Sequence, residues 1–298
     1  MASAPFGTVL TAMVTPFDAD GSVDLDTAAA VARFLVADGS DGIVVAGSTG
    51  EGTALSDEEK MDLFACVAGA VTVPVLAGST SSDTARSVAL TRRVAETGVA
   101  GVLATTPAYA RPSQAGIVGH LGAVAQSTAL PIMLYDIPSR TGRKIAAATT
   151  IGLVHSHPNI TALKDASGDL PGAAHVAETL GSALSLYSGD DALLLPFLAI
   201  GAVGIVSVAA HWAGPEFAAI VRCVEHDDWA TARTINERLA RSCAFESTES
   251  APNPIPAKAA MRSMGFPVGQ CRLPLGPAEH DIDVTAASIV TELRAARV

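Results

Sequence analysis

The chain has 298 residues, of which 49% are hydrophobic and 16% are charged, and its formal net charge is −11 at pH 7. This length and hydrophobic content are enough for a large buried core, in one α/β barrel or in two domains. The negative charge, without a cluster of Lys and Arg, argues against nucleic acid binding, which needs basic side chains to neutralise phosphates.

The cysteines are Cys66, Cys223, Cys243 and Cys271, which lie far apart in the sequence and have no metal-binding spacing. We therefore expect reduced thiols and no metal or other cofactor. No Lys or Arg precedes Arg33, so the sequence begins without the basic segment of a signal peptide, and we expect a cytoplasmic protein.

Short apolar segments recur along the chain and are typical of buried strands. They are residues 8–14, 41–47, 74–78, 101–106, 131–136, 160–164, 184–189 and 204–208. Between them lie segments with helical periodicity, of which 24–39, 56–71 and 80–98 are the clearest. Because strands that are apolar on both faces and joined by helices form parallel sheets, this pattern predicts an α/β protein with a closed (β/α)8 TIM barrel. A doubly wound open sheet is the alternative.

Residues 192–210 form a nearly uncharged stretch that is about as long as a membrane span. Pro196, Gly201 and Gly204 divide this stretch, and no basic residue flanks it closely. We therefore expect a short helix followed by a strand, and no membrane span.

After the eighth predicted strand the pattern is helical. Residues 229–247 are the clearest helix, and the proline-rich segment 252–256 interrupts the pattern. We predict a catalytic barrel over residues 1–214 and a C-terminal helical appendage over residues 215–298.

Catalytic side chains of such a barrel lie at the carboxyl ends of the strands and in the loops that follow them. Polar and reactive residues occur at these points here. They are Ser48 and Thr49 in GSTGEG, Tyr109 in TPAYARPSQ, Tyr135 and Arg140 in YDIPSRTG, Lys164 at the end of ITALK, Gly189 in SGDD and Val206 in GIVSV. An amine, hydroxyls, phenols and a guanidinium are thus expected at one mouth.

Each of these residues also has an ordinary structural use. A lysine at a strand end commonly extends into solvent, and Ser48 and Thr49 could cap a helix. GSTGEG could be a phosphate-binding loop, but Glu51 would repel phosphate and no lysine follows it. It is their convergence on one mouth that favours a catalytic site.

The chemistry that suits this set is a Schiff base with a 2-oxo acid. A lysine attacks a ketone only when it is neutral, and burial among apolar strands disfavours the charged form of an amine. Tyr135 beside Lys164 could move protons as the carbinolamine collapses, with Ser48 and Tyr109 extending the relay to water.

Two carboxylates could be bound at the same mouth. The backbone N–H groups around Ser48 and Thr49, ahead of a helix, could hold the carboxylate of the 2-oxo acid. Arg140 would then be free to hold a second carboxylate in a bidentate manner.

Motifs that cover nearly the whole chain occur in the order found in one known family. They are TAMVTPFDADGSVD, GSTGEGTALSDEE, TTPAYARPSQAG, MLYDIPSRTG, ALKDASGD, YSGDDA, GIVSV and PNPIPAK. On these motifs the chain resembles the dihydrodipicolinate synthase family, within the pyruvate-dependent lyases that include N-acetylneuraminate lyase. The choice within that larger group depends mainly on Arg140 in SRTG, on PNPIPAK and on CRLPLGP.

The resemblance implies a lyase of lysine biosynthesis by the diaminopimelate route. Pyruvate, bound to Lys164 as an imine, would condense with L-aspartate 4-semialdehyde. Tyr135, Ser48 and Tyr109 would form the proton relay, with Tyr109 supplied by a neighbouring subunit.

The resemblance also implies the residues that bind the substrates, and the assembly. Thr49 would bind the pyruvate carboxylate, Val206 and Gly189 would line the pyruvate pocket, and Arg140 would bind the semialdehyde carboxylate. No cofactor is implied, and the family is usually a homotetramer built as a dimer of dimers.

Three positions depart from the family pattern. Ser48 stands where the synthases usually have threonine and resembles the neuraminate lyases, although the hydroxyl is kept. Asp136 stands where Asn is common after the tyrosine. Ala108 replaces the first tyrosine of a Tyr-Tyr pair, which removes an aromatic side chain from the expected dimer interface.

The pocket in which inhibited family members bind lysine also differs. The matching positions are Lys60, Ser82, Arg86 and Ala108, where the family uses His, Asn, Glu and Tyr. Because Arg86 replaces the glutamate that would pair with the ammonium of lysine, we expect an enzyme that lysine does not inhibit.

Two other functions are alternatives to the synthase. One is a different pyruvate-dependent Schiff-base aldolase or dehydratase that acts on a sugar acid; Arg140 argues against a neutral polyol partner. The other is a barrel that binds a 2-oxo acid as a regulator without catalysis, against which the joint presence of Lys164, Tyr135, Tyr109 and Ser48 argues.

Overall fold

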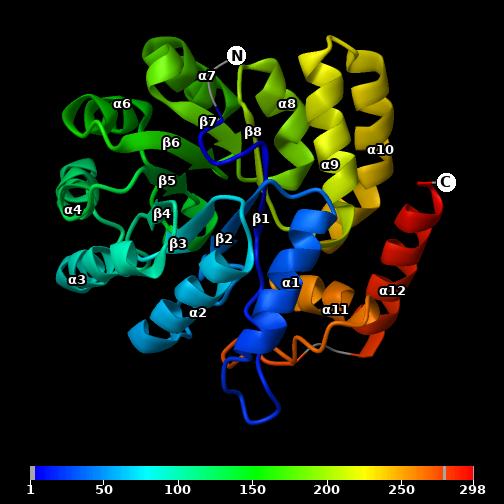
Figure 1. Cartoon of the computed structure of the whole chain (residues 1–298). Helices are drawn as coiled ribbons and strands as arrows, with labels where there is room; N and C mark the ends of the chain where they lie inside the picture. The colour runs from blue at the N-terminus through cyan, green and yellow to red at the C-terminus, as the bar shows by residue number, and fades with distance from the viewer. Residues whose placement is uncertain (1–3, 278–279, 298) are drawn as a thin grey trace.

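The computed structural model of the chain describes residues 4–277 and 280–297. Eight parallel strands follow one another around a closed barrel, in which β1 pairs with both β2 and β8. The strands are β1 (Val9–Ala12), β2 (Gly42–Val45), β3 (Val75–Gly78), β4 (Gly101–Thr105), β5 (Ile132–Asp136), β6 (Ile160–Asp165), β7 (Ser185–Ser188) and β8 (Gly204–Ser207). Each lies within its predicted segment, apart from β6, which extends by one residue. The predicted (β/α)8 barrel is confirmed, and the open sheet is wrong (Figure 1).

Helices follow the strands and surround the barrel (Figure 1). They are α1 (Leu25–Ala37), α2 (Asp57–Ala70), α3 (Thr84–Val94), α4 (Gln114–Gln126), α5 (Pro138–Thr141), α6 (Ala147–Ser156), α7 (Leu170–Leu180) and α8 (Leu194–Ala199). The helices expected over 24–39, 56–71 and 80–98 are present, and each begins after a side-chain cap. At α2, Ser56 and Glu59 form a capping box, which satisfies backbone N–H groups at the helix start.

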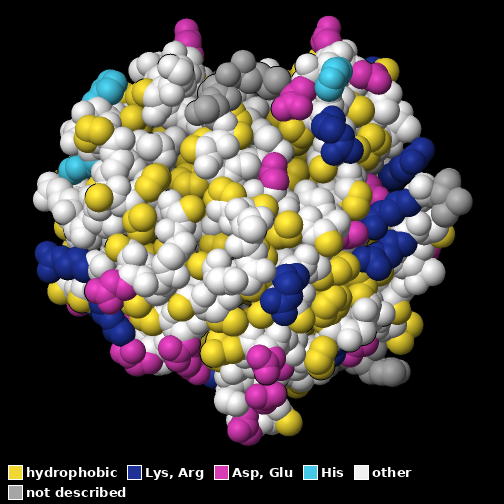
Figure 2. Space-filling model, viewed as in Figure 1, with side chains coloured by type: hydrophobic (Ala, Val, Ile, Leu, Met, Phe, Trp, Pro, Cys, Tyr) yellow, Lys and Arg dark blue, Asp and Glu magenta, His cyan; other side chains and the backbone are white. Residues whose placement is uncertain are grey.

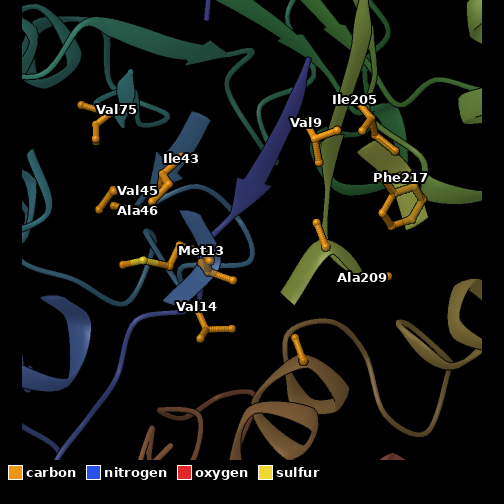
Figure 3. Packing of buried hydrophobic residues seen from close by; sticks show 14 of the residues in the cluster. Val9, Met13, Val14, Ile43, Val45, Ala46, Val75, Ile205, Ala209 and Phe217 are labelled. Atoms are coloured by element: carbon orange, nitrogen blue, oxygen red, sulfur yellow. The ribbon is translucent and has the colours of Figure 1, made fainter. Parts of the chain in front are cut away.

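Side chains alternate along each strand and therefore build two apolar layers. One layer lies between the strands and the helices and contains Val9, Ile43 and Ile205, which Figure 3 shows on neighbouring strands. The other fills the barrel interior and contains Leu10 and Val206 among others. Because the interior is filled by side chains, chemistry is confined to the barrel mouth.

The apolar stretch 192–210 folds as expected into a short helix, α8, and a strand, β8. In the part of the chain that the structure describes, no helix has the length and hydropathy needed to cross a membrane. On the face drawn in Figure 2, acidic and basic side chains are interspersed with apolar ones.

The C-terminal region is helical, as predicted. It contains α9 (Ala210–Glu225), α10 (Trp229–Phe245), α11 (Ile255–Ser263) and α12 (His280–Ala295). The pairs α9 with α10 and α11 with α12 pack side by side (Figure 1). The proposed division at residue 214 falls inside α9, next to Ala213, whose φ of −123° interrupts the helix. The division into two domains therefore stays a prediction.

Candidate active site

A cavity of about 340 Å³ opens among the loops that follow the strands. Ser48 from the loop after β2, Tyr135 from β5 and Arg140 from α5 contribute to its wall. Arg272 and Leu275, from the segment between α11 and α12, line it as well. The cavity therefore lies at the mouth where the sequence predicts the site, and the C-terminal region closes part of it.

Lys164 and Tyr135 lie side by side on adjacent strands. They are register partners between β5 and β6, and each is only 3% exposed. The Lys164 Nζ lies 4.2 Å from the centroid of the Tyr135 ring. Tyr135 lines the cavity, and Lys164 lies behind it, buried against the Tyr135 ring and outside the residues that form the cavity wall.

Gly189 and Val206 complete the surroundings of this pair. A Cβ atom on Gly189 would lie 3.0 Å from the Lys164 Cγ and 2.9 Å from the Ala166 Cβ, so glycine leaves room for the lysine stem. Val206 is 1% exposed and belongs to the interior layer that also includes Tyr135.

Thr49 and Arg140 are joined through a residue of the C-terminal region. The Asn253 side chain donates a hydrogen bond to Thr49 Oγ1 (2.9 Å), and the Arg140 guanidinium donates to the Asn253 backbone carbonyl (3.0 Å). Thr49 is 2% exposed, whereas Arg140 lines the cavity. Asn253 thus fixes one polar residue on each side of the mouth.

Tyr109 is the predicted residue that the fold does not bring to the others. Its side chain is 97% exposed, and its backbone adopts a positive φ of 68° in the loop after β4. Within the described residues it is not part of the cavity wall. A single copy of the chain therefore assembles the site without Tyr109.

The chain has four lysines, and their surroundings differ. Lys144 pairs with Asp169, and Lys258 pairs with Glu51. Lys60 is buried on α2, outside the barrel, and burial lowers its pKa. In the part of the chain that the structure describes, Lys164 has no carboxylate in ion-pair contact, and it is the lysine that lies against a tyrosine ring.

The model of the dihydrodipicolinate synthetase family matches residues 5–293. The chain belongs to this family. The 4-hydroxy-tetrahydrodipicolinate synthase 2 of Halalkalibacterium halodurans is 46% identical over 274 residues, which are 91% of this chain and 93% of the relative.

Solved structures of the family have the same fold. A dihydrodipicolinate synthase from Bacillus anthracis superposes with a TM-score of 0.92 at 39% identity, covering 98% of this chain and 99% of the other. The enzyme from Cyanidioschyzon merolae, solved with lysine bound, has a TM-score of 0.94 at 40% identity and the same two coverages. The family resemblance seen in the motifs is therefore confirmed.

A buried ion pair lies at the mouth, and the sequence did not predict it. Glu51, in the GSTGEG motif, contacts Lys258 of PNPIPAK at 2.7 Å, and their side chains are 1% and 0% exposed. Glu51 also accepts a hydrogen bond from the Arg272 backbone N–H (2.8 Å). The glutamate within the glycine-rich motif was the signal that could have indicated this contact. Its partner could not be identified from the sequence, because Lys258 lies more than 200 residues away.

Proposed function

We propose that the protein is a 4-hydroxy-tetrahydrodipicolinate synthase, a lyase that condenses pyruvate with L-aspartate 4-semialdehyde through an imine on Lys164. The observation that carries the proposal is the buried Lys164, which has no carboxylate in ion-pair contact among the described residues and lies 4.2 Å from the centroid of the Tyr135 ring. Membership of a family whose relatives carry this name supports the choice of reaction.

The proposed steps use Lys164 and Tyr135 first. The neutral amine of Lys164 adds to C2 of pyruvate, and the carbinolamine loses water when Tyr135 supplies a proton to the departing hydroxyl. Tyr135 then takes a proton from C3 to give an enamine, whose C3 attacks the aldehyde carbon while Tyr135 returns the proton to the aldehyde oxygen. Addition of the amino group of the semialdehyde, or of water, to the imine carbon finally expels the Lys164 amine and releases the product. Thr49 binds the pyruvate carboxylate, Val206 and Gly189 shape the pocket around it, and Arg140 binds the carboxylate of the semialdehyde.

We assign Ser48 and Tyr109 to a proton relay that links Tyr135 to water. The exposed Tyr109 side chain supports a site that is completed by a neighbouring subunit, because an exposed phenol in the mouth loop is available to a second copy. We therefore propose a homotetramer built as a dimer of dimers, which sedimentation velocity tests directly. A cytoplasmic location fits the four free cysteines.

A coupled assay tests the proposed reaction. Pyruvate and L-aspartate 4-semialdehyde together should give product at a rate that depends on both, whereas pyruvate with a neutral sugar aldehyde should not. Condensation with a sugar acid aldehyde alone would favour the related aldolases. An imine with pyruvate but no condensation with any aldehyde would favour the regulator.

Replacing Arg140 with lysine should weaken the use of the semialdehyde. Lysine offers a single point charge instead of a planar fork, so bidentate binding of the carboxylate is lost. Since hydrogen bonds to charged groups contribute about 1.5–3 kcal/mol, we expect kcat/KM for the semialdehyde to fall roughly 10- to 100-fold. Steady-state kinetics with each substrate varied should show little change in kcat/KM for pyruvate. An equal loss for both substrates would mean that Arg140 serves only to hold Asn253.

Lysine should not inhibit this enzyme. Arg86, which stands where the family has glutamate, is paired with Asp57 at 2.9 Å, and Ser82 donates a hydrogen bond to the Ala108 carbonyl (3.0 Å), so these side chains offer no free carboxylate to the ammonium of an effector. Like charges weaken binding of the lysine ammonium. Initial rates at half-saturating substrates should stay constant as lysine is titrated into the millimolar range. Partial inhibition with calorimetric binding of lysine would contradict this expectation.

A further inference from the structure

Asp136 is a buried acid next to the proposed catalytic tyrosine. It is the last residue of β5 and is 2% exposed. Because side chains alternate along a strand, Asp136 points away from the barrel interior into which Tyr135 points. It therefore lies behind the site, between the strand ends and the surrounding helices.

The Asp136 carboxylate holds the far end of the segment that carries Arg140. Its Oδ1 accepts a hydrogen bond from the Ile145 N–H at 3.0 Å, which closes the loop of residues 137–145 onto the end of β5. Arg140 lies within this loop and reaches Asn253. Gln114 also holds the segment, by donating to the Lys144 carbonyl (3.0 Å), and this uncharged contact does not change with pH.

Some charged groups around Asp136 oppose its ionisation, and one favours it. Asp165, its register partner on β6, disfavours a second negative charge. Lys144 in the loop favours the charge, but Lys144 is paired with Asp169 at the start of α7, whose own charge opposes it. Burial is the largest effect and raises the pKa of Asp136 to about 7. Asp136 therefore changes charge within the physiological range, which an asparagine could not do.

We propose that Asp136 is a positioning residue for the second substrate: it holds the loop of residues 137–145, and hence Arg140, through the Ile145 N–H, and it holds this loop more firmly when ionised. The inference rests on the proposed function, because Arg140 is taken to bind the semialdehyde. A charged acceptor forms a stronger hydrogen bond than a neutral one. Use of the semialdehyde should thus improve relative to use of pyruvate as Asp136 loses its proton.

The matched variant is Asp136→Asn, which keeps the shape and the acceptor oxygen but cannot ionise. The ratio of wild-type to variant kcat/KM for the semialdehyde should rise roughly three- to fourfold between pH 6 and pH 8, since a charged hydrogen bond is worth about fivefold more than a neutral one and Asp136 goes from mostly protonated to mostly ionised over this range. The same ratio for pyruvate should stay flat, because imine formation precedes binding of the semialdehyde. Dividing by the variant removes every pH effect that the two proteins share. A flat semialdehyde ratio, or equal changes for both substrates, would overturn the proposal.

Two measurements do not depend on activity. In hydrogen–deuterium exchange, the peptide covering residues 137–145 should be more protected in wild type than in Asp136→Asn at pH 8 and equally protected at pH 6. In thermal unfolding, the stability advantage of Asp136→Asn should widen as pH rises from about 4 to about 7, because the unfolded carboxyl ionises near its usual pKa while the folded one stays protonated. Above pH 7 the advantage should level off.

The combined results separate the two proposals. If the wild type condenses no aldehyde but the exchange and unfolding differences appear, the proposed function fails while the role of Asp136 in holding the loop stands. If the enzyme is active but residues 137–145 exchange identically in both proteins at both pH values, the proposed function stands and the role of Asp136 is wrong.

Discussion

Replacing Lys164 with arginine should abolish both the imine with pyruvate and the condensation. Arginine keeps a positive charge on a stem of similar length, but its guanidinium stays protonated and does not form an imine under these conditions. Since removal of a catalytic nucleophile typically costs about 10³-fold or more in kcat, activity should fall to the background of the assay. Borohydride reduction in the presence of pyruvate, followed by intact mass and peptide mapping, should give one adduct on Lys164 in wild type and none in the variant.

The other lysines provide the control for this experiment. Lys144 forms its ion pair with Asp169 outside the barrel interior, so Lys144→Arg should keep the adduct on Lys164. Tyr135→Phe should still form the adduct, but more slowly, because the ring is kept and the proton donor is lost. An adduct on Lys144 or Lys258, or no adduct in wild type, would show that the Schiff-base mechanism is wrong.

Replacing Lys258 with methionine should lower the free energy of unfolding by about 3–5 kcal/mol. Lys258 and Glu51 are both completely buried and in contact, so removal of the lysine leaves a carboxylate without its counter-ion inside the protein. Methionine keeps most of the aliphatic stem but removes the ammonium, whose Nζ also lies 4.1 Å from the centroid of the Phe17 ring, so the loss includes this contact. Urea unfolding followed by circular dichroism measures the change.

Double replacement distinguishes the ion pair from simple packing. In Lys258→Met combined with Glu51→Gln, no uncompensated charge remains, and the glutamine oxygen can still accept from the Arg272 N–H. The double variant should therefore be less destabilised than the sum of the two single variants. Strictly additive losses would mean that the pair contributes nothing through its charges. The exposed pair of Arg93 and Glu58 is the comparison, since solvent screens its charges and its loss should lower stability far less.

The barrel could be predicted from the sequence because its signals are local. Each strand is a short apolar run between helix caps such as Ser56 and Asp83, and these patterns need no knowledge of distant residues. The pairing of Tyr135 with Lys164 then follows from the topology, since β5 and β6 are neighbours in a barrel. Polar residues at strand ends could be assigned to the mouth on the same grounds.

Contacts between the two ends of the chain could not be predicted in this way. Asn253 meets Thr49 across a separation of 204 residues, and no periodic pattern encodes such a contact. Glu51 was interpreted as a residue that would repel phosphate, while its partner was only one residue of a C-terminal motif. The role of Tyr109 stays a prediction, because in a single copy of the chain its side chain is exposed and has no surroundings from which a role follows.

The ion pair between Glu51 and Lys258 joins an early and a late part of the chain, so the order of synthesis affects when it can form. The eight strands leave the ribosome before Lys258 and Arg272 do, so during synthesis Glu51 has no counter-ion and is more stable in water than inside the barrel mouth. We therefore expect the loop after β2 to take its final position only after the C-terminal helices have formed. A chain that ends before Lys258 would leave the Glu51 carboxylate without its counter-ion, so the mouth depends on the last part of the chain to be synthesised.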